Sequence, residues 1–203
     1  MINHITMKCM ILGFAIGAMA LHLGCGSKME APTTYERWVD EDGAFSIDYP
    51  ADWSAEGGGK NGVKWAEFSN GTALIKLDFD TTSSIIGDIA GSQNQGGSFG
   101  DEPLPPEVEM KLAPVHKAHE FNKDRTAMLY SDFQETAAEK YMSGLGDSRK
   151  SEFVSSSIMG SVRGYRSTAL TINQAVIVVC SCSASDWETL KPAFDKILAS
   201  LGR

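Results

Sequence analysis

Residues 175–180, Ala-Val-Ile-Val-Val-Cys, constrain the fold of this chain more than any other stretch. Every side chain in the run is apolar, so an extended strand here presents an apolar surface on both of its faces. Such a strand is stable only when other elements cover both sides of the sheet that contains it. The run therefore predicts the central strand of a sheet that is covered on both faces.

Upstream segments alternate between apolar and polar residues, as half-buried antiparallel strands do. The alternation is present in residues 45–49, 63–69 and 72–80. The last two segments are joined by Asn70-Gly71, a hairpin dipeptide in which both residues tolerate a positive φ. We expect the three segments to form an antiparallel meander, with a turn at the three glycines of residues 57–59.

The middle of the chain, residues 106–133, is predicted to be mainly helical. Pro106 suits a first helical turn, where its missing N–H needs no partner, whereas Pro114 interrupts or kinks the helix. The second part of this region has apolar residues roughly on one side, namely Val115, Ala118, Phe121, Met128 and Leu129.

A second helix is predicted at the end of the chain. Ser185 and Glu188 have the spacing of a capping box, in which each side chain satisfies a backbone N–H of the other residue. Apolar residues at helical spacing follow within residues 194–201 and form an amphipathic stripe. Gly202 is placed to end the helix as a C-terminal cap.

Two stretches resemble the PsbP-like family, whose fold is shared with the Ran-binding Mog proteins. They are residues 45–53, Phe-Ser-Ile-Asp-Tyr-Pro-Ala-Asp-Trp, and residues 187–201 in the terminal helix. The element order is similar over about residues 45–201. The resemblance implies an α+β fold in which helices sandwich an antiparallel β-sheet. Members of the family include photosystem extrinsic subunits and bacterial envelope proteins, and the matched positions are core and turn residues, so no functional residue is transferred.

The first 24 residues are predicted to be a signal peptide rather than part of the fold. Lys8 precedes an apolar run over residues 9–21, which has the length of a signal peptide and is too short to span a membrane. Translation starts either at Met1 or at Met7, because Met7 and Lys8 would also make a charged start.

Residues 21–25, Leu-His-Leu-Gly-Cys, resemble a bacterial lipoprotein signal, in which the cysteine is lipidated and becomes the mature N-terminus. Gly24 fits the pattern, whereas His22 and Leu23 depart from it. Two outcomes therefore stay open. Acylation of Cys25 would anchor the protein to a membrane facing the periplasm, and plain cleavage would release a secreted protein.

Residues 25–36 are interpreted as a tether, and residues 37–203 as a single domain with a Gly- and Pro-rich loop at about 81–106. The formal net charge of −8 argues against nucleic acid, because phosphate binding needs a basic surface. No cofactor is expected. The expected partners are the lipid bilayer, through an acylated Cys25, and another envelope protein or a small ligand.

The loop contains Ser98 within residues 96–100, Gly-Gly-Ser-Phe-Gly, a sequence similar to the motif of a nucleophile elbow. Asp101 and then His116 or His119 follow in the order of a hydrolase triad. A nucleophile elbow needs a sharp turn between a strand and a helix, whereas this serine lies between a glycine loop and a proline-rich segment. A serine hydrolase is therefore the alternative to a non-catalytic binding protein. The candidate binding loop consists of Gly96, Gly97, Phe99 and Gly100.

His116 and His119 are three positions apart on a predicted helix and therefore share a face. Two imidazoles at this spacing can hold a metal when a third ligand comes from elsewhere in the chain. A solvated helix face is the alternative interpretation of the pair.

Two pairs of residues on the predicted strands complete the set of candidates. Cys180 and Cys182 point to one face of their strand, where they serve as small buried hydrophobes. Arg163 and Arg166 point to opposite faces of another strand. One of these cations could meet an anion or an acidic partner, and a surface pair packed around Tyr165 is the alternative.

Overall fold

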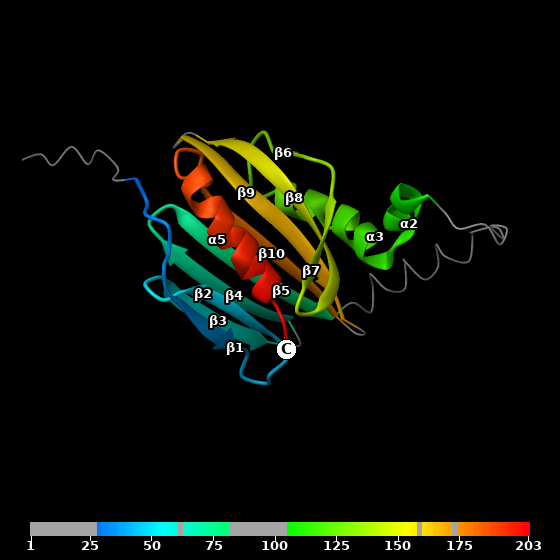
Figure 1. Cartoon of the computed structure of the whole chain (residues 1–203), viewed down its shortest axis with the longest axis horizontal. Helices are drawn as coiled ribbons and strands as arrows, with labels where there is room; N and C mark the ends of the chain where they lie inside the picture. The colour runs from blue at the N-terminus through cyan, green and yellow to red at the C-terminus, as the bar shows by residue number, and fades with distance from the viewer. Residues whose placement is uncertain (1–27, 61–62, 82–104, 158–159, 172–173) are drawn as a thin grey trace, which may run out of the picture.

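A computed structural model describes residues 28–60, 63–81, 105–157, 160–171 and 174–203 of the chain. These residues form an antiparallel sheet of 8 strands and a separate two-stranded ribbon. Helices lie on both faces of the large sheet (Figure 1). The α+β architecture is the one predicted from the sequence.

The strands of the large sheet are β3 (Ser54–Lys60), β4 (Val63–Asn70), β5 (Ala73–Thr81), β6 (Gln134–Glu135), β7 (Glu139–Ser143), β8 (Gly146–Ser157), β9 (Gly160–Leu170) and β10 (Gln174–Ser183). The ribbon consists of β1 (Tyr35–Val39) and β2 (Ser46–Pro50). The helices are α2 (Pro106–Leu112), α3 (Pro114–Phe121), α4 (Lys123–Ala127) and α5 (Trp187–Ser200). The sheet order is β3-β4-β5-β10-β9-β8-β6, and β7 also pairs with β8.

Strand β10 lies between β5 and β9, which confirms the central position predicted from its apolar run. Val176 and Val178 belong to the main core under α5. Ile177 and Val179 point to the opposite face, where they pack with Phe153 of β8. Both faces of the strand are therefore buried.

The main core lies between α5 and the sheet (Figure 1). Helix α5 contributes a buried stripe of Leu190, Phe194, Ile197 and Leu198, and β5 contributes Ala73, Ile75, Leu77 and Phe79. Trp53, the last residue of the family-like stretch, is buried edge-to-face against Phe194 at 6.4 Å. Each large apolar side chain buried in this layer stabilises the fold by about 1.5–3 kcal/mol.

The N-terminal part of the sheet differs from the predicted meander. Strand β2 pairs with β1 in the ribbon, and Ser46 also pairs with Gly202 in an isolated bridge. The third strand of the meander is instead β3, which includes residues 57–59 that were expected to turn. Gly57 explains the difference, because a β-carbon there would collide with the ring of Trp38 from β1. The glycine thus leaves room for a tryptophan rather than making a turn.

Both ends of α5 also differ from the prediction. The capping box does not form: the N-cap residue is Asp186, whose side chain caps no helical N–H and instead accepts a hydrogen bond from the N–H of Met29 at 3.0 Å. Glu188 pairs with Arg163 at 3.2 Å rather than reaching back to the helix start. Gly202 is engaged in its bridge to β2 and is not the cap of the helix.

The middle region forms three short helices. The chain breaks at Ala113, before Pro114 as predicted, and breaks again at Asn122. The second break ends the helical spacing that would have kept Met128 and Leu129 on the same side as the apolar residues of α3. Val115 and Ala118 are buried, whereas Phe121, Met128 and Leu129 are 62%, 85% and 63% exposed.

Residues 28–34, which were assigned to the tether, lie against the domain. Met29 packs on the main core, and the carbonyl of Thr34 accepts a hydrogen bond from the N–H of Ala51 at 3.1 Å. The folded domain therefore begins before residue 37. No helix within the described ranges is long and apolar enough to cross a membrane.

Candidate functional site

The predicted site residues fall into two groups. Cys25, Ser98, Asp101 and the binding loop of residues 96–100 lie outside the described residues. His116 and His119 lie on α3, which packs on β8 and β9. The geometry around these two histidines and around the neighbouring helix α4 defines the candidate site.

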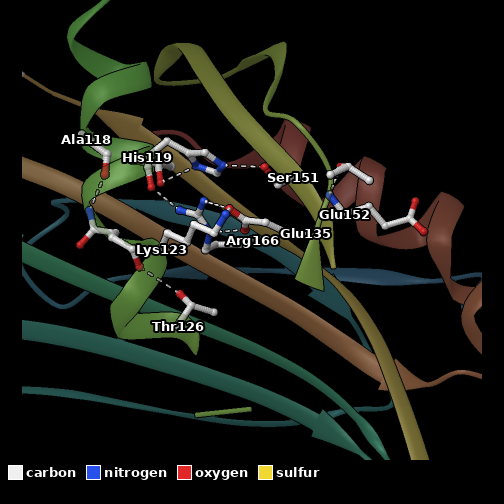
Figure 2. A network of polar contacts seen from close by, with 11 residues as sticks. Ala118, His119, Lys123, Thr126, Glu135, Ser151, Glu152 and Arg166 are labelled. Carbon is white, nitrogen blue, oxygen red and sulfur yellow. Dashed lines mark hydrogen bonds and ion pairs between the residues drawn. The ribbon is translucent and has the colours of Figure 1, made fainter. Parts of the chain in front are cut away.

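His119 is completely buried between α3 and the sheet, where Figure 2 shows it beside Ser151. Its Nδ1 is 3.0 Å from Oγ1 of Thr168, and its Nε2 is 3.0 Å from Oγ of Ser151. Both ring nitrogens are therefore occupied by hydroxyls of the sheet. A metal ion or an attacking nucleophile could use this imidazole only after one of these hydrogen bonds had been broken.

Arg166 lies next to His119 and is also completely buried. Its Nε and one terminal nitrogen donate to the two carboxylate oxygens of Glu135 at 2.9 and 2.8 Å, and another terminal nitrogen donates to the carbonyl of His119. Lys123 of α4 is 3.4 Å from the same carboxylate. Figure 2 shows that these residues converge from α3, α4, β6 and β9. A bidentate pair of this kind is among the strongest polar contacts in proteins.

The surroundings of His119 favour its neutral form. Burial, followed by the positive charge of Arg166, lowers the pKa of His119 to about 2. His116 and the cations Arg149 and Lys123 act in the same direction. The neutral imidazole donates one hydrogen bond and accepts the other, which matches the two hydroxyls that face it. The network joins α3 to β6, β8 and β9.

His116 does not join this network. It is half-buried, and its Nδ1 has no hydrogen-bond partner among the described residues. Burial is the main cause that lowers the pKa of His116. Within the described part of the chain, no group of three or more His, Cys, Asp or Glu side chains is arranged to hold a metal ion.

The two strand cysteines are free thiols that are buried under α5. Burial raises the pKa of Cys182 to about 12 and that of Cys180 further. Neither thiol is therefore available as a thiolate nucleophile, since the thiolate is the reactive form. Their position agrees with the predicted role as small core residues.

A groove of about 350 Å³ lies on the same side of the sheet as α3 and α4. Helix α3 packs on β8 and β9, and the groove lies beside it, between α4 and the outer face of β5 and β10. Its lining residues are Glu67, Leu74, Lys76, Asp78, Arg125, Thr126, Leu129, Tyr130, Ile177 and Val179.

The groove combines an apolar floor with charges of both signs. Leu74, Ile177 and Val179 come from adjacent strands of the sheet. Asp78 of β5 and Arg125 of α4 are 3.9 Å apart and link the sheet to the helix. A concave surface with a mostly apolar lining and a few polar groups is the usual form of a binding site.

The predictions from sequence missed the main components of both features. Arg166 was expected to meet an anion or to lie at the surface, and nothing in the local sequence identified Glu135 as its partner. The signal for the groove was present in β5, where Leu74, Lys76 and Asp78 alternate with the core residues. That alternation predicts a polar face, but it does not show which part of the face a helix leaves uncovered.

No protein-family model and no curated protein matches the chain. Among solved structures, the chain is similar to cyanobacterial PsbP (CyanoP) from Synechocystis sp. PCC 6803, with 15% identity, 87% of this chain and 94% of that chain covered, and a TM-score of 0.48. It is also similar to a protein from Bacteroides thetaiotaomicron, with 13% identity, 84% and 49% of the two chains covered, and a TM-score of 0.49.

A third similar structure is LpqN of Mycobacterium tuberculosis, which is involved in cell envelope biogenesis. The identity is 11%, 84% of this chain and 91% of that chain are covered, and the TM-score is 0.37. PsbP is thus among the structures that the chain resembles, in agreement with the resemblance expected from sequence. Similarities at this level concern the fold and do not extend to function.

Proposed function

We propose that this protein is a non-catalytic component of the bacterial cell envelope, anchored by lipid at Cys25, which binds another envelope protein through the groove beside α4. The observation that supports binding most directly is the groove itself, with its apolar floor and its charges of both signs. The side chain of Leu129, which lines the groove, and that of the adjacent Met128 are exposed apolar groups. An apolar surface of this kind, edged by polar residues, suits a protein partner.

The buried network supports a binding role over catalysis. A general base must accept a proton near neutral pH and must reach its substrate. His119 has both nitrogens engaged by Thr168 and Ser151, and burial keeps its pKa near 2. The network accordingly serves to fix α3 and α4 on the sheet, and this position of α4 forms one wall of the groove.

The anchor is tested by replacing Cys25 with Ser. We expect the wild-type protein to partition into the detergent phase after phase separation, because an acylated cysteine holds several buried methylenes, each worth ~0.8 kcal/mol. The C25S protein is expected in the aqueous phase. Equal aqueous partitioning of both proteins would refute the anchor and favour a secreted form.

Binding through the groove is tested with two matched substitutions. Leu129 and Met142 are both large, apolar and exposed, at 63% and 64%, but only Leu129 lines the groove. We expect Leu129→Asp to lose a crosslinked envelope protein that the wild type and Met142→Asp both capture. The proposal is wrong if L129D retains the same crosslinked protein as the wild type, or if M142D loses it equally.

A further inference from the structure

The anchor proposed at Cys25 has a consequence for how the domain sits on a membrane, because the chain after Cys25 is fixed to the domain almost at once. The N–H of Met29 donates to the carboxylate of Asp186 at 3.0 Å, and the Met29 side chain packs on the main core. Met29 is only four positions after Cys25. Four residues span at most roughly 14 Å when fully extended.

The attachment point is rigid. Asp186 is buried, is the N-cap residue of α5, and also accepts a hydrogen bond from Oγ of Ser183 at 2.6 Å. The carbonyl of Asp186 accepts the backbone N–H groups of Thr189 and Leu190. Met29 is therefore attached to the end of β10 and the start of α5, and not to a flexible loop.

Asp186 lies at one end of the long axis of the strands. Ser183 of β10 pairs with Val162 of β9, and the last residues of β8 lie at the same end of the sheet. The opposite end contains the turn between β1 and β2, which includes Asp42, and the bridge to Gly202. Figure 1 shows the start of α5 and the C-terminus at opposite ends of the sheet. A 12-residue strand such as β8 is about 40 Å long, so the segment from Cys25 to Met29 is short compared with the domain.

We propose that the contact between Met29 and Asp186 holds the domain upright on the bilayer, with the end that contains the start of α5 facing the lipid. This inference rests on the proposed anchor at Cys25. The whole chain has a formal net charge of −8, and Lys8 lies in the segment that precedes Cys25, so the acidic domain has no electrostatic attraction to anionic lipid and we expect contact only at the tethered end. The groove lies on the side of the sheet and therefore opens parallel to the membrane, toward a neighbouring envelope protein.

The test compares two labelling sites of equal exposure. The side chains of Glu188, in the first turn of α5, and of Asp42, at the opposite end, are each 79% exposed. Glu188→Cys or Asp42→Cys is labelled with a donor fluorophore in the full-length lipidated protein, where Cys180 and Cys182 are buried. The protein is placed in phosphatidylglycerol–phosphatidylethanolamine vesicles that contain a headgroup acceptor. We expect severalfold stronger energy transfer from position 188 than from position 42.

A third substitution tests the contact itself. Met29→Pro removes both the N–H donor and the methionine side chain that packs on the core, and it leaves Asp186 unchanged. The next contact of the chain is then at Pro32, whose carbonyl accepts a hydrogen bond from the Tyr35 hydroxyl at 3.4 Å, so the free segment lengthens to seven residues, or roughly 25 Å. We expect the difference between the two labelling sites to shrink in M29P, while the thermal unfolding of the domain is retained.

Flotation of the vesicles separates the two proposals. If the labelled protein floats with the vesicles and transfer from the two sites is equal, the orientation is refuted and the anchor stands. If M29P leaves the difference unchanged, the contact between Met29 and Asp186 is not what orients the domain. A wild-type protein that fails to float overturns the anchor and the orientation together.

Discussion

The buried histidine makes the stability of the protein depend on pH in a way that can be calculated. His119 has a pKa of about 2 in the folded protein and an ordinary value of 6.5 when it is exposed. As the pH falls below 6.5, the unfolded chain binds a proton that the folded chain does not bind. The free energy of unfolding therefore decreases by about 1.4 kcal/mol per pH unit from this group, and the decrease continues down to the folded-state pKa.

The magnitude follows from that linkage. Between pH 7.5 and pH 4.5, His119 alone removes roughly 2–3 kcal/mol from the free energy of unfolding. His119→Gln abolishes this contribution, while the amide can still donate to one hydroxyl and accept from the other. The glutamine side chain in H119Q does not titrate, so we expect the unfolding free energy of the variant to fall by roughly 2–3 kcal/mol less than that of the wild type over the same interval.

The assay is urea unfolding at several pH values between 7.5 and 4.5, with the variant and the wild type measured in parallel. Carboxylates titrate in both proteins, so their contribution cancels in the difference. His116→Gln is the matched control on the same helix. Burial also lowers the pKa of His116, but this side chain is only half-buried, so H116Q is expected to change the pH slope in the same direction and by less than H119Q does. Identical pH slopes for H119Q and the wild type would refute the assignment of a buried neutral imidazole at this position.

Two further predictions concern packing and charge. Glu135→Ala leaves the buried guanidinium of Arg166 without its carboxylate and is expected to cost about 3–5 kcal/mol of stability in urea unfolding. Glu188→Ala removes an exposed partner and is expected to cost less than about 1 kcal/mol. Equal losses in the two variants would contradict the burial of the pair between Arg166 and Glu135. Gly164→Ala places a β-carbon against the neighbouring strand and is expected to lower stability by about 1–3 kcal/mol. Gly58→Ala is the tolerated control, because the nearest atom to a β-carbon there belongs to the Trp65 side chain at 3.6 Å. If a thermal melt finds Gly58→Ala less stable than Gly164→Ala, the close packing around Gly164 of β9 is wrong.

Local patterns in the sequence determined those elements whose structure depends mainly on neighbouring residues. The apolar run 175–180 identified the central strand, because a strand that is apolar on both faces must be covered on both. Asn70-Gly71 identified the hairpin between β4 and β5, where Gly71 has a φ of 57°. Pro114 identified the break between α2 and α3. The stripe within residues 194–201 identified the helix that covers the core.

Of the candidate site, the sequence supplied the positions of His116 and His119 on one helix and the placement of Arg163 and Arg166 on opposite faces of a strand. It did not supply the pairing of Arg166 with Glu135, because the partner is 31 residues away and belongs to a strand of only 2 residues. It also did not supply the two hydroxyls that occupy the ring of His119, since they come from different strands.

The tertiary structure alone decided the remaining features, and the physical reason is the same in each. Whether residues 57–59 turn or extend depends on Trp38, which must find room over Gly57. Whether the carboxylate of Asp186 caps α5 or binds Met29 depends on where the N-terminal segment returns. The sequence thus determined the strands and helices through their periodicity, while contacts between distant segments decided how those elements are capped, buried and left open at the groove.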